Sequence, residues 1–427
     1  MKVGVVGLWH LGSVTAACLA GAGLETVGVD FDATAVEGLA EGRAPLFEPG
    51  LDDLLAAGLS SGKLSFTTDP AGVAGAGVVW VAYDTPVDDD DRADVDFVLD
   101  AFWRVAPHVK DGAVVLISSQ LPVGTTRATA ERFAQEFPDK RCHFAYSPEN
   151  LRLGGAIQIF SKADRIVVGV DSAEARTLLE RLLSRFSENL LFISIESAEM
   201  TKHALNAFLA TSVTFANEVA NLCEKVGADA MEVERALKSE SRIGPKAYLR
   251  PGAAFAGGTL ARDVIFLGDV ARQNGVATPL LESIPQSNAA HRLWPIARVE
   301  AELGSVEGKR IAVLGLVYKP GTSTLRRSSA VEACRALNER GATVVAHDPA
   351  LSSLPADLDG VVTLAPTVEG CVAGADAIIV ATEWPEFREL SPDRLGPRPP
   401  VVIDANGFLR GTLGSVPALR YLTVGRP

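Results

Sequence analysis

The sequence predicts an α/β protein in which two doubly wound domains are joined by a central all-helical domain. Three observations predict this fold. A pattern of strand, glycine turn, helix and strand starts at residue 2 and starts again at residue 309, and residues 197–225 between them form a helical pattern without Gly or Pro. Because 427 residues are too many for one ordinary core, we expect domains at residues 1–195, 196–300 and 301–427.

The first strand, turn and helix have the pattern of a Rossmann-like dinucleotide site. Residues 2–7 form a β-branched strand that ends in a glycine, helical spacing follows, and a second strand ends in an acid 23 residues after that glycine. The helix N-terminus is expected to meet the pyrophosphate and the acid to bind the ribose diol, which favours NAD over NADP. A tryptophan replaces the middle glycine of the turn. The expected cofactor contacts here are Gly7, Trp9, His10, Leu11, Gly12 and Asp30.

Four further strands complete the first predicted sheet, at residues 78–82, 113–118, 142–146 and 165–170. Four consecutive aspartates at residues 88–91 have no spacing typical of metal ligands, and we expect a solvated loop there.

The central helical pattern has apolar residues on more than one face, so we expect a spine that is packed on several sides. Ser197 is expected to cap its start, and Glu199 to favour the positive end of its dipole. Lys202 and Asn206 lie four residues apart and therefore on one face. They are either an ordinary surface lysine and a loop-capping amide, or a pair that binds a ligand.

A second helix is predicted at residues 230–239, and residues 251–263 form a loop of small residues. Such a loop is either a tight interdomain turn or a place where the backbone approaches a ligand. The last domain repeats the first pattern, with a helix at 328–340 and strands at 342–348, 375–382 and 401–404. Lys319, Arg326 and Arg327 follow its first strand and favour binding of a nucleotide's phosphates.

Composition excludes several classes of function. A net charge of −13 argues against a nucleic-acid partner, and no apolar run is long enough to cross a bilayer. The five cysteines are scattered, which is typical of reduced thiols and not of a metal site. We therefore expect a cytoplasmic protein without a membrane partner or a metal.

Nine short motifs occur in a characteristic order along essentially the whole chain. They are Glu48-Pro49-Gly50-Leu51, Thr85-Pro86, Pro122-Val123-Gly124-Thr125-Thr126, Ser147-Pro148-Glu149, Glu199-Met200-Thr201-Lys202 with Asn206, Arg242-Ile243-Gly244, Pro251-Gly252 with Gly257, Tyr318-Lys319-Pro320-Gly321-Thr322 with Arg326, and Thr382-Glu383-Trp384. In these motifs the chain resembles the UDP-glucose/GDP-mannose dehydrogenase family of nucleotide-sugar 6-dehydrogenases. The resemblance implies an NAD domain, a central domain that forms a homodimer, and a C-terminal domain that binds the nucleotide, most simply that of a UDP-hexose.

Members of this family oxidise the C6 alcohol of the sugar twice with two NAD, and a cysteine captures the intermediate aldehyde. The resemblance implies that Lys202 and Asn206 bind the reacting oxygen, that Asp263 holds a water and that Glu149 is a supporting acid or base. Further implied NAD contacts are Thr85, Pro86, Gln120, Arg262 and Arg326. The implied substrate contacts are Leu151, Arg242, Tyr248, Leu249, Arg250, Gly257 and Lys319.

The chain departs from the family pattern in the second oxidation. Thr259 falls at the cysteine position, and a threonine hydroxyl is a far poorer nucleophile. Four other replacements are Gln120 for a threonine, Leu153 for a glutamate, Arg262 for a lysine and Asn406 for an arginine. Three hypotheses remain: an oxidoreductase that stops at the aldehyde or acts redox-neutrally, an ordinary four-electron dehydrogenase, and a catalytically silent nucleotide-sugar sensor.

Overall fold

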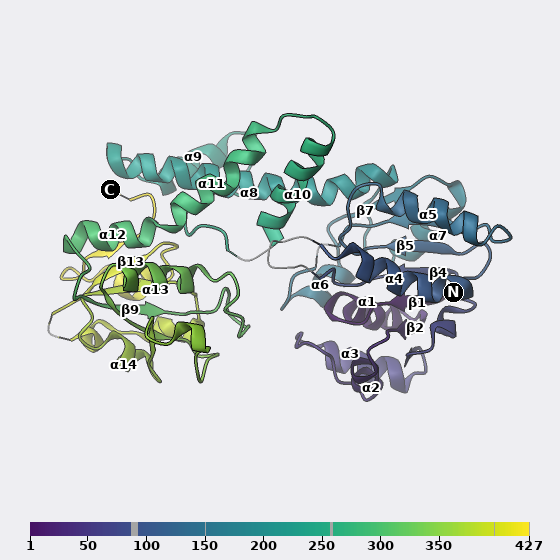
Figure 1. Cartoon of the computed structure of the whole chain (residues 1–427), viewed down its shortest axis with the longest axis horizontal. Coiled ribbons are helices and arrows are strands. Elements are labelled where there is room, and N and C mark those ends of the chain that lie inside the picture. Colours follow the sequence, from purple (N-terminus) through teal and green to yellow (C-terminus); the bar gives the residue numbers. More distant parts are fainter. Residues whose placement is uncertain (87–92, 150, 257–258, 397, 427) are drawn as a thin grey trace. The chain divides into compact units, whose positions relative to one another are not determined.

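The computed structural model describes residues 1–86, 93–149, 151–256, 259–396 and 398–426. The predictions made for residues 88–91 and for Gly257 therefore lie outside the described residues. The described chain divides into two compact units, Met1–Leu205 and Asn206–Pro427 (Figure 1).

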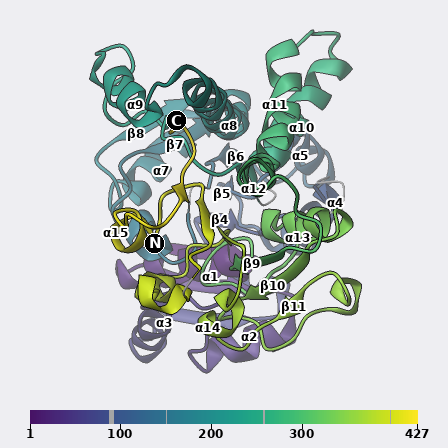
Figure 2. The ribbon, with the colours of Figure 1, turned by 90° about the vertical axis from the view of Figure 1, so that its left-hand side faces the viewer.

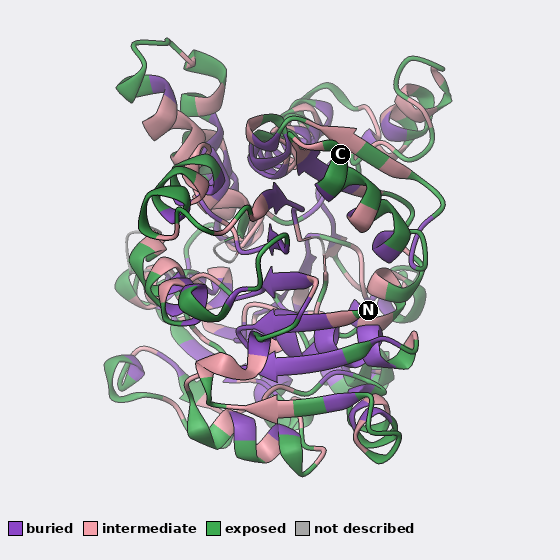
Figure 3. Ribbon diagram, turned by 90° about the vertical axis from the view of Figure 1, so that its right-hand side faces the viewer, coloured by how far each residue is buried: buried purple, intermediate pink, exposed green. Residues whose placement is uncertain are grey.

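The first unit is built on an eight-stranded sheet in the order β3-β2-β1-β4-β5-β6-β7-β8. All neighbouring strands are parallel except β6 and β7, which are antiparallel. Most of these strands are buried, as Figure 3 shows. The strands are β1 (Lys2–Val6), β2 (Glu25–Val29), β3 (Leu64–Thr67), β4 (Val78–Val81), β5 (Val114–Ile117), β6 (His143–Tyr146), β7 (Ile166–Val170) and β8 (Leu190–Ile193).

The strand order reverses between β1 and β4, and such a switch point opens a crevice at the carboxyl ends of the strands. Helices cover the sheet, and several begin at side chains that accept backbone N–H groups, as Asp32, Asp94 and Ser172 do for α2, α4 and α7. The helices are α1 (His10–Gly21), α2 (Ala33–Ala40), α3 (Leu51–Ser60), α4 (Val95–Val105), α5 (Thr125–Glu136), α6 (Ala156–Ser161) and α7 (Ala173–Leu183).

The predicted spine is helix α8 (Ile195–Val226). The prediction that Ser197 caps it is wrong, because the helix starts two residues earlier and Ser197 lies in its first turn. Glu199 also acts differently from the prediction. Its buried carboxylate accepts the N–H groups of Gly124 at 2.6 Å and Thr126 at 2.9 Å, so it caps the start of α5 rather than its own helix.

The second unit has four shorter helices after α8, and α8 packs against the two that carry Val264 and Ile284 through a small core of these residues with Ala207 and Ala210. The helices are α9 (Ala230–Ser239), α10 (Thr259–Gln273), α11 (Pro279–Arg292) and α12 (Trp294–Leu303). The predicted helix 230–239 is confirmed without change. A larger core joins Ala220 and Cys223 of α8 to the sheet that follows.

That sheet has the order β11-β10-β9-β12-β13-β14, and its strands are all parallel (Figure 2). It therefore repeats the β3-β2-β1-β4-β5 order of the first unit. The elements are β9 (Arg310–Leu314), α13 (Ser329–Glu339), β10 (Thr343–His347), β11 (Thr363–Leu364), α14 (Val368–Val372), β12 (Ala377–Val380), β13 (Val401–Asp404), α15 (Arg410–Leu413) and β14 (Tyr421–Leu422). The predicted fold class, with two Rossmann-like sheets and a helical middle, is confirmed.

Candidate active site

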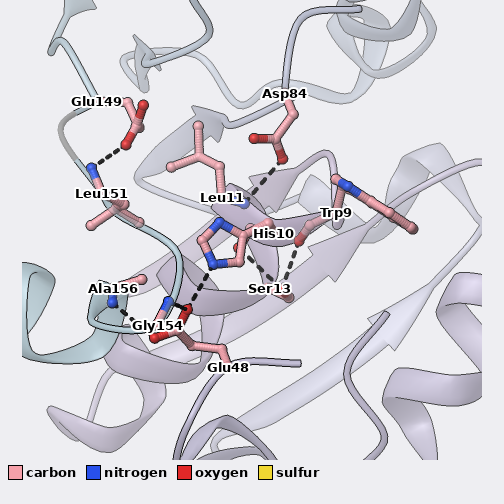
Figure 4. A network of polar contacts seen from close by, with 10 residues as sticks. All are labelled: Trp9, His10, Leu11, Ser13, Glu48, Asp84, Glu149, Leu151, Gly154 and Ala156. Atoms are coloured by element: carbon pink, nitrogen blue, oxygen red, sulfur yellow. Dashed lines mark hydrogen bonds and ion pairs between the residues drawn. The ribbon is translucent and has the colours of Figure 1, made fainter. Parts of the chain in front are cut away.

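The glycine turn between β1 and α1 has the backbone expected of a dinucleotide site. Gly7 has a φ of +94°, and a Cβ there would lie 2.7 Å from the Tyr83 ring. A Cβ at Gly12 would lie 1.6 Å from the Gly7 carbonyl oxygen, so only glycine lets the helix approach the turn. Trp9 has a φ of −73°, which suits any residue, and its indole is 49% exposed and points away from His10 (Figure 4). The replacement of the middle glycine therefore leaves the turn intact.

Asp30 lies at the end of β2, where a ribose-binding acid is expected. Its carboxylate accepts N–H groups from Leu8 at 2.6 Å, from Phe31 at 2.6 Å and from Asp32 at 3.0 Å. The second sheet repeats this arrangement, because Asp348 after β10 accepts the N–H of Leu316 at 2.7 Å. Asp348 is buried, whereas Asp30 is partly exposed and keeps a face for a ligand. Both acids thus bond the turn that follows the first strand of their sheet, and Asp30 is the more accessible of the two.

Glu48 connects this turn to the segment that follows β6, through the network drawn in Figure 4. The side chain is buried and accepts His10 Nε2 at 3.0 Å, Gly154 N at 2.8 Å and Ala156 N at 2.9 Å. Burial acts to raise the pKa of Glu48, but the hydrogen bonds from His10 and from the two amides outweigh it and hold the pKa below its usual range. The motif that begins at Glu48 therefore has a structural role that the sequence did not show.

We expect Glu48→Gln to destabilise the protein by about 1–3 kcal/mol, because one of the two buried acceptor oxygens becomes an NH2 group that faces N–H donors. Since the folded pKa is lowered, this stabilisation is complete above the unfolded pKa and is lost as the pH falls through the folded value. Chemical unfolding at two pH values measures both effects. Glu41→Gln, which changes an exposed partner of Arg43, is the control. Equal stability of the two variants would contradict the role given to Glu48.

Lys202 and Glu149 are brought together in the first unit. Lys202 is 8% exposed, its ammonium donates to the Glu149 backbone carbonyl, and Nζ lies 3.6 Å from Glu149 Oε2. The Glu149 carboxylate also accepts the N–H of Leu151. A nearly buried ammonium beside a carboxylate is unlike the surface lysine of the simpler interpretation.

Glu149 borders a cavity of about 630 Å³ in the first unit. Its lining includes Thr15, Trp80, Glu149, Leu151, Phe160 and Phe186. Thr85 and Gln120, two further predicted cofactor contacts, meet through a 2.9 Å hydrogen bond from the Thr85 hydroxyl to the Gln120 carbonyl, and Pro86 follows directly. The predicted contacts of the first unit thus gather at the carboxyl ends of the strands.

In the second unit, Asn206 of α8 donates from Nδ2 to Oδ2 of Asp263, and both side chains are buried. Thr259 is the first residue of α10 and is exposed, one helical turn before Asp263 and on the same face. Arg262, beside Asp263, is partly buried. Because α8 is continuous, Lys202 and Asn206 lie on successive turns of one helix.

The loop of small residues is held by amide side chains from three elements of the second unit. Asn217 Oδ1 accepts Gly252 N at 2.9 Å, Asn406 Oδ1 accepts Ala253 N at 2.7 Å, and Asn288 bonds both backbone groups of Phe255 at 3.0 Å. A Cβ at Gly252 would lie 2.2 Å from Asn406 Oδ1. Asn406, which replaces the expected arginine, therefore positions this loop.

The remaining predicted substrate contacts lie in two other segments of the second unit. Arg250 donates to the Asn406 carbonyl at 3.2 Å, Tyr248 is 60% exposed, and Leu249 lines a small pocket. Arg242 is exposed and pairs with Glu240 at 3.1 Å. Lys319 and Arg326 lie in the segment between β9 and α13, as the sequence predicts.

All five cysteines are described, and none lies on α10. Cys18 and Cys223 are buried within α1 and α8, Cys334 and Cys371 lie in the core of the second sheet, and Cys142 precedes β6 at its amino end. Burial raises the pKa of Cys18 to about 11. Cys223 is 17 residues beyond Asn206 on α8, roughly 25 Å along the helix.

One feature of this site has no counterpart in the sequence analysis. Asp84, after β4, bonds the start of α1, and its position beside the switch point is the only sequence signal that could have revealed it.

Among the described residues, no helix is long and apolar enough to span a membrane. A glycine turn that leads into α1, an accessible acid after β2 and a second nucleotide-type sheet define a dinucleotide-dependent enzyme.

Comparisons with known proteins place the chain more closely. The family models of the UDP-glucose/GDP-mannose dehydrogenases match residues 1–187 (NAD binding domain), 196–290 (central domain) and 312–411 (UDP binding domain). The chain belongs to the UDP-glucose/GDP-mannose dehydrogenase family. It is accordingly an NAD-dependent oxidoreductase of the nucleotide-sugar dehydrogenase class, which acts on CH–OH groups.

Several relatives match over the full chain. A UDP-glucose 6-dehydrogenase of Rhizobium meliloti is 35% identical, with all of both chains covered, and TuaD, a UDP-glucose 6-dehydrogenase of Bacillus subtilis, is 32% identical, with 100% of this chain and 93% of the relative covered. Among solved structures, a UDP-glucose dehydrogenase from Pyrobaculum islandicum is 31% identical, with a TM-score of 0.87 over 100% of this chain and 98% of that chain.

Proposed function

We propose that the protein oxidises the C6 primary alcohol of a UDP-hexose to the aldehyde with one NAD, and either stops there or returns the hydride after a change at the sugar. The observation that carries this proposal is the residue set on α8 and α10. The groups for removing a proton and a hydride are present as Lys202, Asn206 and Asp263, whereas residue 259 at the start of α10 is a threonine.

The reaction needs charge stabilisation and a proton acceptor. As the hydroxyl loses its proton, the Lys202 ammonium and the Asn206 amide stabilise the developing alkoxide. Asp263, held by Asn206, accepts the proton through a water. Bound NAD supplies the hydride acceptor, so the balance is alcohol plus NAD⁺ to aldehyde, NADH and a proton. Glu149 holds the Lys202 ammonium in place through its carbonyl and carboxylate.

A second oxidation through a thioester needs a thiolate beside the aldehyde. The positions of the five cysteines give no support to such a thiol on α10. The names of the relatives favour a second candidate, the ordinary four-electron dehydrogenase that yields a uronic acid from a hydrated aldehyde. Counting NADH against sugar consumed separates the two. At most one NADH per UDP-glucose supports our proposal, and two would overturn it.

We further propose that the protein acts as a homodimer through α8. Phe208, Phe215 and Leu222 recur every seven residues on this helix and are 66%, 49% and 65% exposed. Apolar residues with this spacing form a stripe along one face, which suits the same face of a second copy. Such a stripe is unusual on a protein that remains monomeric.

We expect light scattering of the purified protein to give twice the chain mass of 44.9 kDa. Replacing Phe215 and Leu222 together by glutamate should shift the protein to the monomer, because both copies then place charges on the shared face. Leu191→Glu, at an exposed residue of β8, is the control and should leave the mass unchanged. A monomeric wild-type protein would contradict the dimer.

A further inference from the structure

Helix α1 begins without a cap of its own. Trp9 at the N-cap position makes no side-chain hydrogen bond to the helix, and the first turn has no acidic residue. The first N–H groups of a helix have no partner within it, and the partial positive charge of this end attracts anions. In a dinucleotide site, these groups receive the pyrophosphate.

A carboxylate of the protein already lies at this helix end. Asp84 Oδ2 accepts the N–H of Leu11 at 3.1 Å, across 73 residues of sequence (Figure 4). Asp84 follows β4, which pairs with β1 on the far side of the switch point. The residue is exposed, so a ligand that enters the crevice can reach it. The anion-binding amide of α1 is thus bonded to an internal anion.

Two charged groups face Asp84. His10 of α1 favours the charged carboxylate, and Glu149, after β6, opposes it. A pyrophosphate bound at α1 would add its negative charges beside those of Asp84 and Glu149. Neighbouring like charges repel one another strongly where water is partly excluded.

We propose that Asp84 is an internal competitor of the cofactor's pyrophosphate, and that NAD binds only when this carboxylate leaves the Leu11 amide or takes up a proton. This role concerns how the NAD site binds its cofactor, and it does not depend on which sugar product the enzyme forms. While Asp84 bonds the Leu11 amide, that amide cannot bind the pyrophosphate. Only the remaining fraction of molecules can bind NAD, and the apparent affinity for NAD falls accordingly.

Asp84 as a residue is exposed, but its carboxyl group, which bonds Leu11, is largely surrounded by protein. This loss of water raises the pKa of the carboxyl above its usual range, and the hydrogen bond from Leu11 and the charge of His10 only partly offset the effect. NAD binding should therefore take up protons and become tighter as the pH falls. Substitution of Asp84 isolates its contribution to this trend.

The test is calorimetric titration of the full chain with NAD alone, from about pH 5 to about pH 8, in buffers of different ionisation enthalpy. Asp84→Asn keeps an oxygen that can accept from Leu11 but removes the charge. We expect it to bind NAD about tenfold more tightly than wild type near pH 8 and to take up fewer protons. Asp111→Asn is the matched control. Asp111 is also exposed and accepts one backbone N–H, from Arg141. It precedes β5, so it lies at the amino ends of the strands, whereas Asp84 lies at their carboxyl ends.

Wild-type affinity or weaker binding in Asp84→Asn would overturn the proposal, as would equal effects of the two substitutions. The melting temperature of each variant without NAD shows whether it is folded. If Asp84→Asn does not fold, the pH dependence of NAD affinity in the wild-type protein decides. Protonation removes the competing charge whether the carboxylate is displaced or neutralised, so an affinity that does not rise as the pH falls would contradict the proposal.

Discussion

Lys202→Met lowers kcat for UDP-glucose oxidation by about a hundredfold to a thousandfold, the effect of removing one preorganised donor to a developing oxyanion. Methionine keeps most of the length of the stem but loses the ammonium. Because Lys202 is nearly buried and donates to the Glu149 carbonyl, the variant also leaves that carbonyl without this donor. We therefore expect a modest fall in melting temperature together with the loss of turnover.

The kinetics of this variant are measured with NAD at saturation, together with its affinity for NAD. Lys140→Met is the matched control, since Lys140 also donates to a backbone carbonyl, that of Pro107, but is only partly buried and precedes β6 at its amino end. The control should keep wild-type kcat. If Lys202→Met kept a tenth or more of wild-type kcat, Lys202 would not be the group that stabilises the alkoxide.

Asp263→Asn lowers kcat by about a hundredfold, within the range observed when a general base is removed. The side chain is fully buried against Asn206, so its effect on the proton acceptor is best separated from an effect on folding by a pH profile. The residual activity of the variant should rise with pH, as hydroxide replaces the missing base.

Asp269→Asn on the same helix is the control, because Asp269 is an exposed partner of Arg272. A kcat for Asp263→Asn within about threefold of wild type would be far smaller than a general base predicts and would give its role to another group. A variant that loses stability but keeps its kcat would make Asp263 a structural residue of the α8–α10 contact.

The sequence predicts those parts of the fold that depend on local patterns. The glycine turn after β1, the uninterrupted spine and the repeated pattern after residue 309 all appear as short-range signals, and the structure confirms them. The edge strands β11 and β14 were not predicted, because two residues carry no period. The edge strands β3 and β8 were also missed, although they are as long as several predicted strands. The antiparallel direction of β7 is also a tertiary property.

The site shows the same division. Lys202 and Asn206 were found from their spacing, but the partners that give acids their roles lie far along the chain. Glu199 caps a helix 73 residues away, and Glu48 bonds amides more than 100 residues away. Asp84 was not singled out, because only the pairing of β1 with β4 brings it to α1. Long-range hydrogen bonds of this kind leave no periodic signal in a single sequence.

The most direct test of the central claim is the stoichiometry of the reaction with UDP-glucose. The purified protein is incubated with excess NAD, NADH is measured by absorbance, and the sugar nucleotide product is identified by mass spectrometry. We predict at most one NADH per sugar consumed and no uronic acid. Two NADH per sugar together with UDP-glucuronic acid would contradict the account.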